Sequence, residues 1–294
     1  MKIIVTGANG FLAQHLCRML VIKGFEVHAL ARGESRLSYC EGIVYHAVEL
    51  TDVSRIDAVF SLVQPHFVIH AAAMSKPDEC FDQPEKCLLH NVEVTRYLLH
   101  TAQQYNSFFI YISTDFIFGD NGPHSEDDLP QPLNFYGESK LMAENLVNAS
   151  GLDTAIVRPV FIYGEQAEGM RADFLHWIRN HLQQQLPVKV VTDQWRTPTF
   201  APDICNGIIE IITRKLTGAF HLAGPEILSP YEMALTVARL LQLDESLITP
   251  VTADTFPERV KRAKRSGLKI DKARKLLGYN PVLFEEGVRR SFGL

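Results

Sequence analysis

The sequence predicts an α/β fold in which a doubly wound parallel sheet is joined to a smaller mixed C-terminal lobe. Short apolar runs alternate with longer segments of helical periodicity through the first half of the chain. The first run leads directly into a glycine-containing turn at residues 7–13. Strands that alternate with helices indicate parallel pairing, right-handed crossovers and a helix layer on each face. After about Gly164 the alternation loosens, and this change predicts the lobe.

Six segments of the first half are predicted to be buried strands, because each is a short apolar run. They are residues 2–6, 26–30, 43–46, 67–71, 108–113 and 154–158. Apolar residues three and four apart predict helices at residues 10–23, 53–63, 85–105 and 136–149. The polar, proline-rich range 119–133 predicts a loop between a strand end and a helix, where active-site loops of such sheets lie.

The second half is predicted to contribute fewer regular elements. Helices are expected at residues 173–186, 204–214 and 230–241, and strands at residues 188–191 and 219–222. A basic stretch follows at residues 259–275. There is no internal repeat or low-complexity linker, so the lobe is expected to be interwoven with the sheet, to which residues 199–222 return.

Composition narrows the class of protein. Of the 294 residues, 46% are apolar and 21% charged, close to the globular average, so extensive disorder is not expected. The net charge of −5 gives no sign of binding to nucleic acid or to an anionic membrane. No apolar run approaches the ~20 residues that span a bilayer, and the N-terminus lacks a secretory signal.

The cysteines and histidines carry information about compartment and metals. Five cysteines, an odd number without a Cys-x-x-Cys pair, indicate free thiols in a reducing compartment, and we expect a cytoplasmic protein. The eleven histidines show no metal-binding spacing, so no metal site is expected.

The turn after the first strand has the spacing Gly-x-x-Gly-x-x-Ala. Glycines permit a tight turn and a close approach of a pyrophosphate, whose charge the N–H groups of the following helix can bind. Gly7, Asn9, Gly10, Phe11 and Leu12 are therefore candidate cofactor-binding residues. The alternative is an ordinary turn between strand and helix. We expect residues 1–163 to form a dinucleotide-binding, Rossmann-like domain and residues 164–294 a substrate-binding lobe.

The second strand bears on the choice of dinucleotide. A carboxylate at its end would bind a ribose hydroxyl and favour NAD, but the strand is followed by Ala31, Arg32 and Gly33. Arg32, with Arg36 as a further candidate, could pair with a 2′-phosphate, which favours NADP (NADPH) over NAD. Both arginines could instead be solvated. Asp52 could accept a hydrogen bond from the adenine or cap the next helix.

Tyr136 and Lys140 lie four residues apart on a predicted helix and share one face. A nearby ammonium lowers the pKa of a phenol toward the range useful for acid–base catalysis. Ser113 and Thr114 supply hydroxyls at the end of the fifth strand, beside the expected cleft. A Tyr/Lys pair alone could be a surface feature, but its order after the glycine turn and Thr114 favours a catalytic set.

The chain resembles the extended short-chain dehydrogenase/reductase superfamily, and within it the dTDP-4-dehydrorhamnose reductase family. The resemblance rests on the motifs at residues 111–119 (YISTDFIFG), 132–140 (PLNFYGESK), 193–199 (DQWRTPT) and 218–224 (GAFHLAG). It implies NADPH-dependent reduction of the C4 ketone of a nucleotide-linked 4-keto-6-deoxy sugar.

The same resemblance implies roles for individual residues. Tyr136 would donate a proton to the ketone oxygen, Thr114 would hold that oxygen, and Lys140 would bind the nicotinamide ribose. The cofactor would pass along three small residues, Ala71, Ala72 and Ala73. The implied substrate-binding residues are Ser75, Trp195 and Arg196. Trp195 could equally be a partly buried aromatic of the lobe.

Two departures leave other activities open. Phe11 stands where the reductases usually carry glutamine, and phenylalanine there is typical of nucleotide-sugar epimerases, which use NAD. The arginines of residues 259–268 match the family only loosely and could bind a diphosphate or form a solvated face. A dehydratase is disfavoured because Thr114 is followed by Asp115 and Phe116 instead of an acidic pair.

A non-catalytic alternative also fits the motifs. The regulatory β subunit of methionine adenosyltransferase resembles the same family and binds a cofactor while serving a partner enzyme. A nucleotide-sugar substrate and a possible homodimer are the partners that the family resemblance implies, and no residue can be assigned to a dimer interface.

Overall fold

The computed structural model describes residues 1–167, 170, 172–256 and 259–294. A seven-stranded sheet of parallel strands lies at the centre, in the order β10-β6-β5-β4-β1-β2-β3. Its strands are β1 (Lys2–Thr6), β2 (Glu26–Ala31), β3 (Ile43–Ala47), β4 (Phe67–His70), β5 (Phe108–Ile112), β6 (Thr154–Arg158) and β10 (Gly218–His221). The strand order changes direction between β1 and β4. The predicted doubly wound sheet is therefore confirmed.

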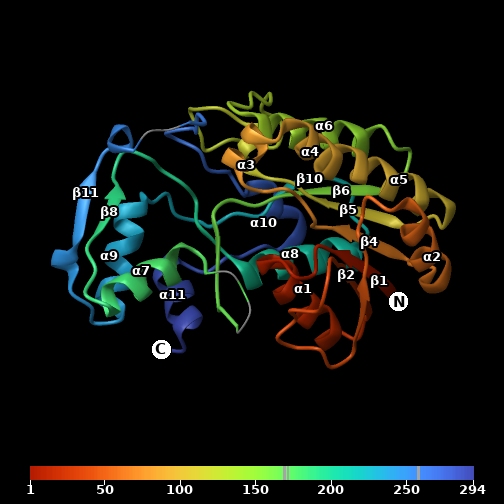
Figure 1. The fold of residues 1–294 in the computed structure, drawn as a ribbon, viewed down its shortest axis with the longest axis horizontal. Helices are drawn as coiled ribbons and strands as arrows, with labels where there is room; N and C mark the ends of the chain where they lie inside the picture. The colour runs from red at the N-terminus through yellow and green to blue at the C-terminus, as the bar shows by residue number, and fades with distance from the viewer. Residues whose placement is uncertain (168–169, 171, 257–258) are drawn as a thin grey trace.

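Helices cover both faces of the sheet (Figure 1). One layer holds α1 (Phe11–Ile22), α8 (Ala201–Arg214) and α10 (Asp271–Leu277), and the other α2 (Val53–Val63), α5 (Val94–Gln104) and α6 (Phe135–Asn148). Successive side chains of a strand point to opposite faces. In β1, Ile3 and Val5 are fully buried toward the first layer, and Ile4 toward the second. This explains why the strands are continuous apolar runs without alternation.

The lobe has its own apolar core, built from α7 (Phe174–Gln183), α9 (Pro230–Leu240) and α11 (Phe284–Phe292). These helices pack beside the parallel pair β8 (Val188–Val191) and β11 (Ile248–Val251), on the left of Figure 1. A second parallel pair, β7 (Ile162–Tyr163) and β9 (Thr199–Phe200), adjoins them. The mixed lobe is thus present, while a domain boundary after residue 163 stays a prediction.

Several elements differ from their predictions. The segment predicted as one helix over 85–105 consists of α4 (Pro84–Leu88), a π-helical turn (Leu89–Glu93) and α5. Three short elements were not predicted: α3 (Pro77–Asp82), α10 and α11. Strands β7, β9 and β11 were also missed, as were the 3₁₀ turns Asp115–Ile117, Glu245–Leu247 and Ala253–Thr255. Elements this short give too few residues for a period to emerge.

No helix in the part of the chain that the structure describes is long and apolar enough to cross a membrane.

Candidate active site

A cleft of about 590 Å³ opens at the carboxyl ends of the parallel strands, where the strand order changes direction between β1 and β4. This is where open α/β sheets bind their ligands. The cleft brings together most of the site residues predicted from sequence. The predicted residues that line it are Gly7, Asn9, Gly10, Phe11, Leu12, Arg32, Arg36, Ala71, Ala72, Ala73, Ser75, Ser113, Thr114, Tyr136 and Lys140.

The glycine turn is shaped by a close approach of two strand ends. Gly7 has a φ of +69°, and a Cβ there would lie 2.7 Å from the Cα and N atoms of Ala72. The Gly10 amide donates to the Gly7 carbonyl at 2.7 Å, and α1 begins at the next residue. Gly10, Phe11 and Leu12 line the cleft, so the positive end of the α1 helix dipole faces it. The turn therefore suits an anion.

Gly7→Ala is expected to destabilise the fold by about 1–3 kcal/mol, because it adds both a left-handed strain and a clash with the Ala72 backbone. Gly24→Ala is a matched control, since Gly24 has a φ of +81° with nothing near its missing Cβ. Denaturant titration of both variants gives the two free energies of unfolding. Equal losses would show that the approach to Ala72 carries no cost.

Asn9 holds the cleft wall together. Its amide nitrogen lies 3.0 Å from the Glu34 carbonyl and 3.2 Å from the Tyr45 hydroxyl, and its carbonyl accepts from the Arg36 amide at 2.8 Å. Asn9 thereby fixes the segment after β2 against the glycine turn. Its side chain is already bonded within the protein, so its contribution to ligand binding is to position this wall.

The part of the cleft formed by the segment after β2 carries the basic side chains of Arg32 and Arg36. The Arg32 side chain is 69% exposed, and its guanidinium is 3.9 Å from the Glu49 carboxylate, too loose a contact to neutralise it fully. Asp52 lies outside the described lining of the cleft. Its carboxylate accepts from the Arg55 amide at 3.3 Å and caps α2. Of the two roles open to Asp52, the structure therefore favours the helix cap, and Glu49 lines the cleft instead.

Tyr136 is placed by the first turn of α6. The Asn134 side chain caps this helix by accepting from the Gly137 amide at 3.0 Å, and it also donates to the Lys261 carbonyl at 2.9 Å. A Cβ on Gly137 would lie 2.1 Å from the Phe116 carbonyl oxygen, so only glycine lets the helix approach the 3₁₀ turn after Thr114. The Asn-Phe-Tyr-Gly order thus fixes the distance between Tyr136 and Thr114.

Burial raises the pKa of Tyr136 above its ordinary value, and a hydrogen bond with Thr114 opposes the rise. The expected lowering of this pKa by Lys140 is therefore wrong for this structure, in which the pKa is raised. A phenol with a high pKa stays protonated at neutral pH, as a proton donor must.

Lys140 is fully buried one turn further along α6. Its ammonium donates to the Ile112 carbonyl at 2.7 Å and lies 4.0 Å from the centre of the Tyr111 ring. Burial lowers the pKa of Lys140 to about 7, and the nearby Glu144 carboxylate acts in the opposite direction. The lysine is thus held at the floor of the cleft, where both Ile112 and Tyr136 also lie.

Sequence reasoning missed the role of Asp115. The Thr114 hydroxyl donates to one Asp115 carboxylate oxygen at 3.3 Å, and the Ser266 hydroxyl donates to the other at 2.9 Å. Burial raises the pKa of Asp115, while Arg196 favours its charged form. Ser266 is 151 residues away in sequence, so no local pattern signals this contact.

Ser113 and Asn91 are two further residues of the site. The Ser113 hydroxyl is buried, lines the cleft and has no hydrogen-bond partner. A buried polar group is normally paired, so this hydroxyl fits a bound ligand.

Asn91 lies in the π-helical turn and connects Met74 to α6. It accepts a hydrogen bond from the Met74 amide at 2.8 Å and donates one to Ser139 at 2.9 Å.

The predicted substrate residues Trp195 and Arg196 lie outside the main cleft. Arg196 is buried and lines a small second cavity. Asp115 and Phe116 line both this cavity and the main cleft. The Arg196 guanidinium donates to the Ala263 carbonyl at 2.9 Å. Trp195 is 37% exposed, and the Arg265 guanidinium lies 5.8 Å from its ring. Arg196 is linked to the main cleft through Asp115, whose charged form it favours.

The basic stretch is paired with acidic residues of other elements. Arg259 bonds to Asp82 at 2.5 Å and Arg262 to Asp78 at 2.5 Å, both on α3. Lys264 lies 3.4 Å from Asp193. The side chains of Arg259 and Lys264 stay 61% and 57% exposed in these pairs, as expected for a solvated face, whereas Arg262 is 26% exposed.

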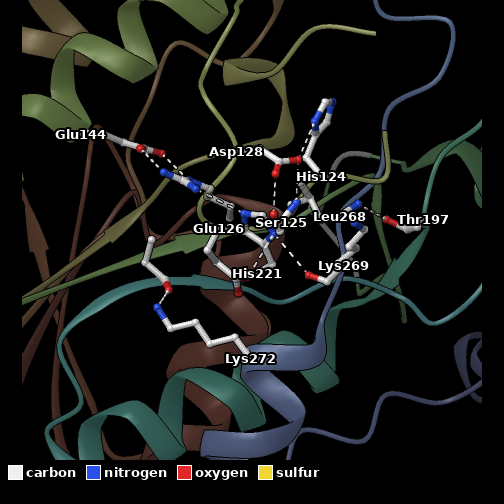
Figure 2. Close-up of polar contacts among 12 residues, drawn as sticks. His124, Ser125, Glu126, Asp128, Glu144, Thr197, His221, Leu268, Lys269 and Lys272 are labelled. Atoms are coloured by element: carbon white, nitrogen blue, oxygen red, sulfur yellow. Dashed lines mark hydrogen bonds and ion pairs between the residues drawn. The ribbon is translucent and has the colours of Figure 1, made fainter. Parts of the chain in front are cut away.

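A buried ion pair supports the back of the site (Figure 2). Arg158, at the end of β6, bonds to both carboxylate oxygens of Glu144 on α6, at 3.0 and 2.7 Å. Arg158 also contacts the His221 ring at 3.3 Å, and the His221 amide donates to Glu126 at 2.9 Å. Figure 2 shows this chain of contacts running from Glu144 through His221 to the loop that holds Glu126. It links α6 to the predicted loop at residues 119–133.

Among the described residues, no group of three or more His, Cys, Asp or Glu side chains is arranged to hold a metal ion.

The doubly wound sheet, the glycine turn after β1 and the Thr114/Tyr136/Lys140 set define the fold and site of an extended short-chain dehydrogenase/reductase. The chain belongs to the family described as RmlD substrate binding domain, whose model matches residues 1–293.

Three known proteins illustrate what this chain is similar to. Methionine adenosyltransferase 2 subunit beta of Rattus norvegicus is 31% identical over 262 residues, 85% of this chain and 75% of that protein. Spore coat polysaccharide biosynthesis protein SpsK of Bacillus subtilis is 27% identical over 290 residues, 98% and 95% of the two chains. The structure of dTDP-4-dehydrorhamnose reductase from Bacillus anthracis in complex with NADP matches with a TM-score of 0.85 and 25% identity, covering 99% and 98% of the two chains.

Proposed function

We propose that the protein is an NADPH-dependent reductase that acts on the C4 ketone of a nucleotide-linked 4-keto-6-deoxy sugar. The observation that supports this most strongly is the gathering of Thr114, Tyr136 and Lys140 in the same cleft as the glycine turn. The Bacillus anthracis reductase, crystallised with NADP, adds support. A bound nicotinamide cofactor would supply the hydride.

The residues present fit a dinucleotide. The Gly7 turn leaves the space that a Cβ would fill, and the cleft volume lies within the range of about 300–1,000 Å³ that is usual for cofactor sites. The unpaired Ser113 hydroxyl offers a hydrogen bond inside the cleft. The cofactor would lie along the glycine turn and the three alanines, that is, along Gly7, Gly10, Phe11, Leu12 and residues 71–73.

Tyr136, Thr114 and Lys140 have distinct roles in the proposed mechanism. The protonated Tyr136 phenol donates its proton to the ketone oxygen, while the Thr114 hydroxyl holds that oxygen. In the structure the Thr114 hydroxyl donates to the Asp115 carboxylate, and it would turn this one proton to the ketone oxygen when a substrate binds. Lys140 donates to the Ile112 carbonyl beside the cleft and would bind the cofactor ribose. In its protonated form it would stabilise the phenolate that forms when the proton has left.

Calorimetry with NADPH, NADH and NAD, each repeated with dTDP present, tests the proposal. We expect preferential binding of NADPH and a further gain when dTDP is present. Tight binding of NAD would instead support an epimerase. Binding of NADPH without any coupling to dTDP would contradict the nucleotide-sugar part of the proposal.

Arg32→Ala is expected to weaken NADPH binding about tenfold and leave NADH binding unchanged, because only NADPH carries a phosphate for Arg32 to pair with. Arg55→Ala is the control. Arg55 is similarly exposed, pairs with Asp52 and lies outside the cleft lining. The same calorimetric titrations measure both variants. Equal losses for the two cofactors would argue against a 2′-phosphate site at Arg32.

A regulatory subunit is the second candidate, and one observation favours it. The methionine adenosyltransferase subunit shares 31% identity with this chain. A regulatory protein would bind NADPH without oxidising it in the presence of a keto sugar, and it would co-purify with a synthetase. The reductase proposal requires ketone-dependent oxidation of NADPH by the protein alone.

A further inference from the structure

Two buried thiols that the proposed mechanism does not use pack beside Tyr136. Cys80 of α3 and Cys87 of α4 have no exposed surface, and they form one apolar cluster with Tyr136. Met74, Phe116 and Phe135 pack against this cluster. The thiols therefore form part of the wall directly behind the proposed proton donor.

The contacts around the thiols place them next to each other. The Cys80 thiol donates to the Met74 carbonyl at 3.3 Å. The Asn91 amide donates to the same carbonyl at 3.1 Å and to the Cys87 sulfur at 3.4 Å. The two thiols thus share one bridge through Asn91 and Met74, and each shifts the pKa of the other.

Their surroundings make the two sulfurs chemically unequal. Cys87 lies 3.3 Å from the Ser139 hydroxyl, accepts from Asn91 and is near the Lys140 ammonium. Interaction with Cys80 is the largest cause that lowers the pKa of Cys87 to about 7, while the same interaction, together with burial, raises the pKa of Cys80. A thiolate with a neighbouring thiol is the usual arrangement of oxidation-sensitive cysteines.

We propose that Cys80 and Cys87 form an oxidisable pair whose disulfide form reversibly weakens ligand binding in the main cleft. A peroxide is the oxidant. The Cys87 thiolate attacks hydrogen peroxide, the O–O bond breaks, and with one proton the products are a sulfenic acid and water. The Cys80 thiol then displaces the sulfenic oxygen, which leaves as a second water with the thiol proton, and the S–S bond forms.

Reaction requires a local opening of the turn between α3 and α4, because neither thiol is exposed. The side chains around this turn, Glu79, Gln83 and Lys86, line the cleft, so an opening there admits a small oxidant. A ligand that fills the cleft should slow the reaction.

A disulfide between Cys80 and Cys87 would change contacts of both cysteines that support the cleft. A disulfide holds its sulfurs about 2.05 Å apart, closer than any non-bonded contact, so α3 must move toward α4. Cys80 would release the Met74 carbonyl, and Met74 lines the cleft. Cys87 would lose its S–H contact with Ser139 on α6, the helix that carries Tyr136 and Lys140.

Peroxide treatment of the full-length Cys40→Ser protein tests the pair, since Cys40 is the exposed cysteine and lies outside the cleft lining. Trypsin cleaves after Lys86, so the Cys80 and Cys87 peptides stay joined only if the sulfurs are bonded. We expect joined peptides, NADPH binding weakened on the order of tenfold by calorimetry, and full recovery with dithiothreitol. Cys80→Ser and Cys87→Ser should each abolish both the junction and the peroxide effect.

Cys17 and Cys205 provide a control within the same molecule. They are also buried, and burial raises the pKa of both. They should therefore stay reduced. Three outcomes would each overturn the proposal. In the first, the Cys80 and Cys87 peptides stay separate after peroxide treatment. In the second, they join only when Cys17 and Cys205 also oxidise, and in the third they join but the NADPH affinity is unchanged. Absence of NADPH binding by the reduced protein would instead contradict the proposed function, while the peptide junction still decides whether the pair oxidises.

Discussion

Tyr136→Phe is expected to lower the rate constant of ketone reduction by about 10²–10⁴-fold while the protein still folds and binds NADPH. The substitution removes one hydroxyl and keeps the ring that packs against Phe116 with centroids 5.4 Å apart. Because burial keeps this phenol protonated, its hydroxyl can serve as the proposed proton source at neutral pH. The loss should therefore fall on the chemical step, with little change in substrate affinity.

Single-turnover oxidation of NADPH, followed by its absorbance, separates the chemical step from product release. Tyr105→Phe is the control, since Tyr105 is half-buried against Phe60 and precedes β5, at the amino end of the strand. Full turnover by the Tyr136 variant would rule out the proposed mechanism. If the unmodified protein binds NADPH but never oxidises it with keto sugars, the regulatory role gains support.

The fold could be predicted from the sequence because its signals are local. Strand β1 is a short apolar run, and α2 repeats buried residues at Ile56, Phe60 and Val63, three and four apart. Tyr136 and Lys140 could be found because helical spacing places them on one face and because they follow the glycine turn and Thr114 in the chain. Gly7 was identified because its turn follows directly on the first strand.

The residues that sequence reasoning missed depend on contacts between distant segments. Asp115 meets Ser266 across 151 residues. Asn91 lies in a π-helical turn of five residues, which is too short for its period to be read from the sequence. For Asp52 the sequence allowed two roles, and only the geometry of the turn before α2 distinguishes the cap from a ligand. Trp195 lies within one of the family motifs but outside the main cleft. Motifs therefore identified the residue types, and packing decided which of them reach the cleft.

Arg158→Met is expected to reduce the free energy of unfolding by about 3–5 kcal/mol, because it leaves the Glu144 carboxylate buried without its partner. The two side chains are only 7% and 2% exposed, so water cannot replace the lost contact. Arg96→Met is the control: its pair with Glu93 is 53% and 39% exposed and should contribute at most about 1 kcal/mol. Denaturant titration measures both variants.

The double variant Glu144→Leu, Arg158→Met separates the cost of a buried charge from the value of the pair itself. If the penalty of Arg158→Met arises from the orphaned carboxylate, removing Glu144 as well should restore much of the stability, and the two losses will not add. Additive losses would mean that the residues act independently. Because Glu144 lies one turn after Lys140 on α6, recovery of stability without recovery of NADPH oxidation would show that the ion pair also holds the lysine in place.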